Sequence, residues 1–131
     1  MELLEKLKHL ELNVKTLAEM KDTLTFEEIE QNKRYEWEIR YGLFESIQIV
    51  IDISCKIVLT YNLGNPNEYK GCIQLLQKHR YLSKELSKKV ISMVGLRNLL
   101  VHEYVQIDNK KLYEYLNFLD DFITFANEIA T

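Results

Sequence analysis

The sequence predicts an all-α protein, an antiparallel up-and-down bundle of about four to five helices, and three observations support this prediction. The 131 residues include only four glycines and one proline, so few positions would interrupt a helix. Apolar side chains recur every three or four residues along most of the chain, which is the period of a helix. Residue types that commonly begin or end helices stand between these stretches. A chain of this size can bury one core, and we expect residues 1–131 to form a single domain.

The first helix is predicted over residues 2–21, where the apolar residues fall on one face. Thr25 and Glu28 have the spacing of a capping box, which predicts the start of a second helix. The helical pattern then continues to Tyr61. Because a helix of roughly 35 residues is unusual in a globular domain, we expect a kink or a break near Gly42.

The segment Asn-Leu-Gly-Asn-Pro at residues 62–66 predicts the end of this long helix and the start of a short one. Gly64 suits a left-handed C-terminal cap. Asn65 is then the expected N-cap of a helix over residues 67–78, with Pro66 in its first turn.

Two further N-caps define the rest of the predicted bundle. Ser83 is expected to cap a helix from Lys84 to Tyr104, and Asp108 is expected to cap the last helix. The apolar spacing of that last helix predicts an inner face made of Leu112, Tyr115, Leu116, Leu119, Phe122, Ile123 and Ile129.

The overall charge gives no sign of nucleic-acid binding. The net charge is −3 and the pI is about 5.7, so a polyanionic partner would need a local basic patch. One basic run is either an ordinary solvated surface or a surface that follows RNA phosphates, and it consists of Lys78, His79, Arg80, Lys84, Lys88 and Lys89.

Cys55 and Cys72 are 17 positions apart and form no CxxC pair, and the three histidines do not cluster with them. We therefore expect no metal site, and reduced cysteines in a cytoplasmic chain. The N-terminal residues alternate charge with leucine, unlike a signal peptide, and the most apolar run, residues 47–61, is too short to span a bilayer. No cofactor and no membrane association are predicted.

The stretch Arg-Asn-Leu-Leu-Val-His-Glu-Tyr at residues 97–104 places several polar groups in a helix otherwise suited to a core. On a helical wheel, one half holds two adjacent rows formed by Arg97, Asn98, His102 and Tyr104. The expected core face is the other half, which holds Met93, Leu96, Leu99 and Leu100. Apolar β-branched residues accompany the polar rows, so that half predicts an interface, at which a second copy of the chain would double the site.

Arginine and histidine together suit the cleavage of RNA without a metal. Arg97 can bind a phosphate bidentately and stays charged, while His102 can transfer a proton near neutral pH. Plainer interpretations stay open: Arg97 could pair with a carboxylate at the edge of the core, Asn98 and His102 could be structural, and Tyr104 could pack in an interface. Asp52, inside an apolar run, is either a partner of Arg97 or His102 or an ordinary exposed residue.

The segment Met-Val-Gly-Leu-Arg-Asn-Leu-Leu-Val-His-Glu-Tyr, residues 93–104, closely resembles the signature of HepT-like proteins in the HEPN superfamily. That signature is an arginine, a polar residue, three further residues and a histidine, often followed by a tyrosine two positions later. Residues 37–54, 63–76 and 112–125 also resemble the corresponding parts of these proteins. The resemblance covers most of the chain, from about residue 25 to residue 130.

The resemblance implies an all-α homodimer with the motifs of both subunits in a cleft at the interface. It implies a toxin that cuts RNA without a metal, with Arg97 and His102 as catalytic residues and Asn98 and Tyr104 in support. It also implies a minimal nucleotidyltransferase as the antitoxin, which transfers AMP to Tyr104. Two alternatives are left open: a non-catalytic HEPN module that binds a nucleotidyltransferase or a nucleotide, and a plain helical dimer with a remnant motif.

Overall fold

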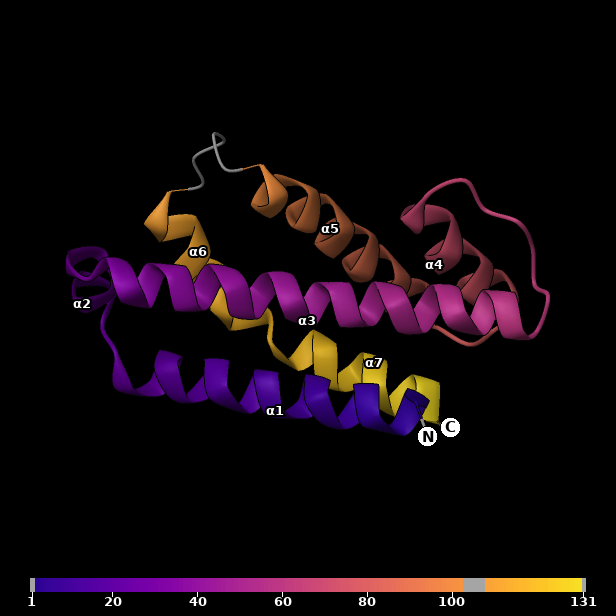
Figure 1. The fold of residues 1–131 in the computed structure, drawn as a ribbon, viewed down its shortest axis with the longest axis horizontal. Coiled ribbons are helices and arrows are strands. Elements are labelled where there is room, and N and C mark those ends of the chain that lie inside the picture. Colours follow the sequence, from indigo (N-terminus) through magenta and orange to yellow (C-terminus); the bar gives the residue numbers. More distant parts are fainter. Residues whose placement is uncertain (1, 103–107, 131) are drawn as a thin grey trace.

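The computed structural model describes residues 2–102 and 108–130 (Figure 1). Within these ranges the chain forms helices and their connections and contains no strand, which confirms the predicted all-α fold. In chain order the elements are α1 (Glu2–Thr23), α2 (Phe26–Gln31), α3 (Lys33–Thr60), α4 (Tyr69–Lys78), α5 (Lys84–Val101), α6 (Asn109–Tyr115), the 3-10 helix η1 (Leu116–Phe118) and α7 (Asp120–Ala130).

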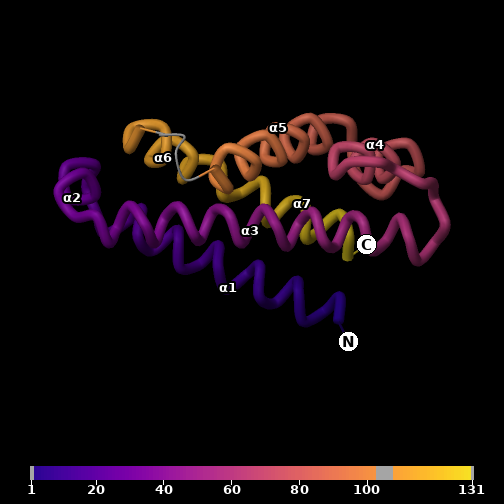
Figure 2. Tube along the Cα trace, turned by 45° about the horizontal axis from the view of Figure 1, so that its top comes forward, coloured from indigo at the N-terminus to yellow at the C-terminus, as the bar shows by residue number. Residues whose placement is uncertain are grey.

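Helix α3 is the central element of the bundle. In Figure 1 it runs the length of the molecule, with α4, α5 and α6 along one side and α1 and α7 along the other. Figure 2 again places α1 and the α4–α5 pair on opposite sides of α3. Each of the other α-helices contacts α3. Residues of α3 therefore lie next to each of the other α-helices, and a site on any of these helices can include residues of α3.

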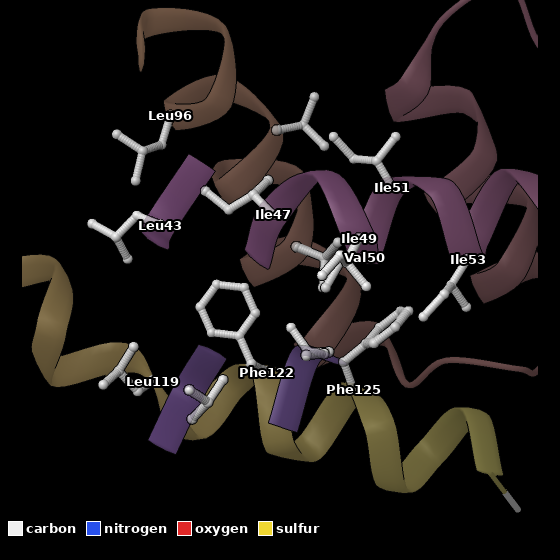
Figure 3. Close-up of a cluster of buried hydrophobic side chains, with 14 of the residues drawn as sticks. Leu43, Ile47, Ile49, Val50, Ile51, Ile53, Leu96, Leu119, Phe122 and Phe125 are labelled. Atoms are coloured by element: carbon white, nitrogen blue, oxygen red, sulfur yellow. The ribbon is translucent and has the colours of Figure 1, made fainter. Parts of the chain in front are cut away.

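The core is centred on the middle of α3. Figure 3 shows Leu43, Ile47 and Val50 of α3 beside Phe122 and Phe125 of α7. Burying one such side chain contributes about 1.5–3 kcal/mol to folding. The buried apolar set also includes Leu10, Val14, Leu17, Ile29, Ile39, Ile49, Ile51, Ile53, Ile57, Val58, Cys72, Ile73, Leu76, Leu82, Leu86, Val90, Val94, Leu96, Leu112, Leu116 and Leu119.

The predicted helix starts at Thr25, Ser83 and Asp108 are confirmed. The Thr25 hydroxyl accepts from the Glu28 N–H, and the Glu28 carboxylate accepts from the Thr25 N–H, both at 3.1 Å. The Ser83 hydroxyl accepts from the Leu86 N–H at 3.2 Å, and the Asp108 carboxylate accepts from the Lys111 N–H at 2.8 Å. Each cap satisfies a backbone donor that has no partner inside its helix.

The predicted break near Gly42 is wrong. The interruption lies instead at Asn32, whose side chain accepts from the Arg34 N–H at 3.0 Å and begins α3 anew. Helix α3 continues through Gly42, where α1 approaches closely: a Cβ there would lie 2.9 Å from Cδ2 of Leu17. The glycine thus marks a helix crossing and not a kink.

The predicted end of the long helix at Tyr61 agrees with the structure, in which Tyr61 is the C-cap of α3, but the predicted caps at Gly64 and Asn65 are wrong. The left-handed residue is Asn62, with φ of 53°, and not Gly64. The Leu63 N–H donates to the Val58 carbonyl at 3.0 Å, the bond expected when a left-handed residue ends a helix. Asn65 and Pro66 lie before α4, whose N-cap is Glu68.

The expectation of reduced cysteines is contradicted. A disulfide joins Cys55 of α3 to Cys72 of α4, with their Cα atoms 5.1 Å apart. A search for closely spaced cysteine pairs misses this bond, because only the packing of α4 against α3 brings the two residues together. The disulfide fixes the position of α4 relative to the central helix.

The last two predicted helices differ in extent. Helix α5 ends at Val101, before the predicted end at Tyr104, and the last helix is divided by η1. Ile123, assigned to the inner face, is 37% exposed, whereas Phe125 is fully buried although it was not predicted there. No described helix is long and apolar enough to cross a membrane.

Candidate functional site

The buried face of α5 agrees with the predicted one only in part: Leu96 is buried as expected, and Met93 and Leu100 are half-buried. Val90 and Val94 are buried, while Leu99, assigned to the core, is 44% exposed. Arg97 follows these valines at positions i+7 and i+3, so it continues the row that packs toward α3. A helical wheel gives the angles between residues, but it does not show which side of the helix packs against a neighbouring helix. Because Arg97 is charged, its side of α5 was predicted to lie away from the core.

The side chain of Arg97 is held by residues of α3 and α4. Its Nε donates to Oε1 of Gln48 at 2.8 Å. The guanidinium carbon lies 5.7 Å from the ring centre of Phe44 and 5.2 Å from that of Tyr69. Both distances are within the range of favourable cation–π contacts. Arg97 is therefore half-buried in a site built by three helices.

Asp52 reaches this site only through Gln48. Nε2 of Gln48 donates to Oδ1 of Asp52 at 2.9 Å, one helical turn further along α3. Asp52 is exposed, as one of the two interpretations of this residue expected. The structure gives no direct bond between Asp52 and Arg97; the amide of Gln48 lies between the carboxylate and the guanidinium.

The structure brings Asn98 to Arg97 and places His102 at the end of the same helix. Oδ1 of Asn98 accepts from Nη1 of Arg97 at 3.2 Å. His102 is the C-cap of α5, in an extended backbone conformation, and its N–H donates to the Leu99 carbonyl at 3.3 Å. His102 is exposed. Tyr104, the fourth motif residue, lies outside the described residues.

An open groove of about 610 Å³ adjoins Arg97, between the start of α4 and the second half of α5. Tyr69 and Lys70 line one side, and Ile91, Gly95 and Asn98 line the other. Arg97 itself does not line the groove, but Tyr69 and Asn98, which contact Arg97, do, together with the acidic residue Glu68.

The basic run lies toward the other end of α5. From Lys84 to Arg97 the helix advances roughly 20 Å at about 1.5 Å per residue. Lys89 pairs with Asp121 of α7 at 3.4 Å, so part of the run stabilises the packing of the bundle. Lys88 and Lys89 are closer, roughly 12–14 Å before Arg97 along the helix axis, so the run begins away from Arg97 and approaches it along α5.

Three residues of the site were not identified from the sequence: Phe44, Gln48 and Tyr69. Phe44 and Gln48 are four positions apart on α3, and Gln48 is four positions before Asp52, so one face of a helix carries all three. This four-residue spacing was the signal in the sequence that could have connected Phe44 and Gln48 with Asp52. Nothing in the sequence around Tyr69 indicates a contact with Arg97.

The fold resembles those of solved HEPN toxins. The tri-AMPylated HEPN toxin of Shewanella oneidensis, in complex with the MNT antitoxin, superposes with a TM-score of 0.89 over 98% of this chain and 96% of that one, at 22% identity. The cytosolic protein YutE of Bacillus subtilis, of unknown function, superposes with a TM-score of 0.83 over 98% and 86% of the two chains, at 15% identity. These likenesses establish the fold alone, an all-α bundle similar to that of the solved HEPN toxin.

The chain belongs to the ribonuclease HepT-like family, whose model matches residues 10–129. The mRNA nuclease HepT of Shewanella oneidensis is 31% identical over 80 residues, which is 60% of each protein. The tRNA nuclease HepT of Aphanizomenon flos-aquae is 35% identical over 72 residues, which is 54% of this chain and 48% of that protein. The matched segments thus span less than two thirds of either relative.

Proposed function

We propose that this chain is a metal-independent endoribonuclease, the toxin of a toxin–antitoxin pair, and that it acts as a homodimer with its active site at the interface. Arg97 and His102 are the catalytic residues, and Asn98 and Tyr104 support them. Membership of the HepT-like family and the two HepT nucleases among the relatives support an activity on RNA. Residues 1–131 act as one domain. The proposed location is the cytoplasm, where the RNA substrate is and where the Cys55–Cys72 disulfide would be unusual.

The neutral hydrogen-bond partners of Arg97 are the observation that carries this proposal. In residues 2–102 and 108–130, its guanidinium donates to the amide oxygens of Gln48 and Asn98, and no carboxylate there forms an ion pair with it. A guanidinium held by neutral acceptors keeps its positive charge for an anionic ligand. Its planar fork matches two oxygens of a phosphate.

The RNA supplies its own nucleophile in the reaction that these residues support. The 2′-oxygen attacks the adjacent phosphorus, the bond to the 5′-oxygen breaks, and the products carry a 2′,3′-cyclic phosphate and a 5′-hydroxyl. One His102 imidazole accepts the proton of the 2′-hydroxyl, and the His102 of the second copy, in its protonated form, gives a proton to the leaving oxygen. Arg97 stabilises the charge that develops on the phosphoryl oxygens.

Features near the C-terminal end of α5 support the proposal that a second copy of the chain packs against this helix. Leu99, which is 44% exposed, lies four positions after Gly95 and therefore on the same face of the helix. A Cβ added to Gly95 would meet no described atom within 4 Å, outside its own helix backbone and chain neighbours. A glycine inside a helix costs about 1 kcal/mol relative to alanine, and no contact in the described chain explains it here. Close approach by a helix of a second copy would explain both the glycine and the exposed leucine.

We also propose that a minimal nucleotidyltransferase neutralises the toxin by transferring AMP to Tyr104. The HEPN toxin of Shewanella oneidensis with the same fold is tri-AMPylated and in complex with the MNT antitoxin. In this chain, AMP on Tyr104 would add a negative charge two residues from His102. That charge would repel the phosphates of RNA.

Expression in growing bacteria tests this function. Wild type, Arg97→Ala and His102→Ala would each be induced, with Arg34→Ala, an exposed arginine of α3, as the matched control. We expect growth arrest and RNA fragments with 2′,3′-cyclic phosphates only for wild type and Arg34→Ala. Intact RNA in all four cultures, with protein that is soluble and unmodified at Tyr104, would refute the nuclease and favour the module that binds a nucleotidyltransferase.

A further inference from the structure

We propose that Gln48 is a positioning residue for the reaction: it aims the guanidinium of Arg97 at the substrate phosphate, and Asp52 sets the orientation of Gln48. This inference rests on the proposed ribonuclease function. It assigns a role to two α3 residues, and neither of them lies in the motif on α5.

The first step is the position of the hydrogen bond on the guanidinium. Gln48 accepts from Nε of Arg97 at 2.8 Å, at the base of the planar group. A bond at Nε fixes the direction of the plane and leaves terminal N–H groups for a phosphate. The terminal Nη1 also donates to Asn98 at 3.2 Å. Asn98 thus accepts from one terminal N–H group, and in the described part of the chain the other N–H groups of Nη1 and Nη2 are left for a phosphate.

The second step concerns the orientation of the glutamine amide. A glutamine can present either its carbonyl oxygen or its NH2 group, and only the oxygen can accept from an arginine. Asp52 removes this ambiguity, because an ionised carboxylate only accepts hydrogen bonds. Nε2 of Gln48 donates to Asp52 at 2.9 Å, so Oε1 faces Arg97.

The third step is the rigidity of the support. Gln48 lies on α3, and the Phe44 ring one turn earlier lies 5.7 Å from the same guanidinium. Two contacts from one face of the central helix restrict both the position and the plane of the group. Catalytic groups that are held in the productive geometry avoid an entropic cost at the transition state, and small displacements reduce rates strongly.

The test is a double-mutant cycle on cleavage of an RNA oligonucleotide by the full chain. We expect Gln48→Leu to lower kcat by about 10- to 100-fold with little change in KM, because the bound substrate is retained but the guanidinium is misaligned. Gln77→Leu, at a half-buried glutamine of α4, is the matched control and should leave kcat unchanged.

Asp52 distinguishes positioning from a general surface effect. Asp52→Ala should lower kcat a few-fold in wild type, but should have no effect in the Gln48→Leu background, because Asp52 acts through Gln48. Asp52→Asn should lower kcat less than Asp52→Ala, because its amide oxygen can still accept from Gln48 but its NH2 group allows the opposite orientation. An equal effect of Asp52→Ala in both backgrounds would overturn the proposed connection.

A second readout does not depend on activity. In a 15N–1H spectrum, the Nε–H resonance of Arg97, assigned with Arg97→Lys, should be resolved and protected from exchange in wild type and in Gln77→Leu, and lost in Gln48→Leu. If the wild-type protein cuts no RNA, the ribonuclease proposal fails. An unchanged Arg97 resonance in Gln48→Leu refutes the role of Gln48, and it does so whether or not RNA is cut. Full activity of a folded Gln48→Leu variant refutes it as well.

Discussion

The guanidinium carbon of Arg97 lies 5.2 Å from the centre of the Tyr69 ring, and this contact connects the motif helix α5 to the first residue of α4. Phe44 and Gln48 connect the same group to α3. The motif arginine is thus positioned by two helices that contain no part of the motif. Changes in those helices should act on the site through Arg97.

Replacing Tyr69 by alanine should lower the rate of RNA cleavage by about two- to fivefold, because a cation–π contact at an exposed site contributes about 0.5–1 kcal/mol. Tyr69→Phe keeps the ring and should retain the wild-type rate. Tyr61→Ala, which removes another exposed tyrosine, is the control. Equal rates for Tyr69→Ala and Tyr61→Ala would show that the ring does not position Arg97.

Reduction of the Cys55–Cys72 disulfide should lower the free energy of unfolding by about 3 kcal/mol, from the entropy of a closed loop of this length. Thermal melts with and without a reductant measure the change. In the Cys55→Ala/Cys72→Ala variant the reductant should have no effect on Tm. An unchanged Tm for reduced wild type, with both thiols detected by alkylation, would contradict the prediction.

Gly95→Leu should weaken self-association while the chain stays folded. The added side chain meets no described atom within 4 Å of its Cβ, but it fills the face of α5 at which a second copy is proposed. Sedimentation velocity over a range of concentrations should show a dimer for wild type and a larger monomer fraction for the variant. The control is Thr16→Leu, which introduces the same side chain at a remote exposed site on α1 and should leave the dimer intact. Loss of the dimer in both variants, or in neither, would count against this interface.

Glu45 should make the stability dependent on pH. Asn13 donates to its carboxylate at 2.8 Å, and this hydrogen bond is the largest cause that lowers the pKa of Glu45 below its usual value of 4.5; Tyr41 and His9 act in the same direction. Because the pKa is lower in the folded state, the stabilisation is present above pH 4.5 and is lost as the pH falls through the folded pKa. Glu45→Gln should therefore lower Tm at pH 7 and leave it close to that of wild type at acidic pH. A difference in Tm that does not shrink on acidification would exclude the ionised carboxylate as the cause.

Phe125→Ala should reduce the free energy of unfolding by about 3–5 kcal/mol, because it leaves a cavity at a fully buried position. Phe118→Ala, at a phenylalanine that is 57% exposed, should change it little. Urea unfolding followed by circular dichroism measures both. Similar midpoints for the two variants would show that the core is not centred on this ring.

Local patterns in the sequence were sufficient for the fold class and for the caps at Thr25, Ser83 and Asp108. Each cap depends on a side chain and a backbone N–H only a few positions away, so spacing is enough to predict it. The break at Asn32 and the left-handed Asn62 were missed, because other residues nearby, Gly42 and Gly64, have stronger intrinsic preferences for such positions. Tertiary packing uses those glycines for close approach instead.

The site residues also fall into two groups: those that local spacing predicts and those that only tertiary packing brings together. Arg97, Asn98 and His102 were predicted because their order and spacing match the signature of HepT-like proteins, and the structure joins the first two by a hydrogen bond. Gln48 is 49 positions from Arg97 in the chain. Only the packing of α5 on α3 creates that contact, so no spacing rule could have predicted it.

The central place of α3 has a consequence for hydrogen exchange. Because each of the other α-helices contacts α3, its middle amides can be exposed only when several helices separate together. Those amides should exchange by global unfolding, while the outer turns of α6 and α7 exchange by local opening. Gln48 lies on the most protected helix, so the support of Arg97 should persist through the fluctuations that open the edges of the bundle.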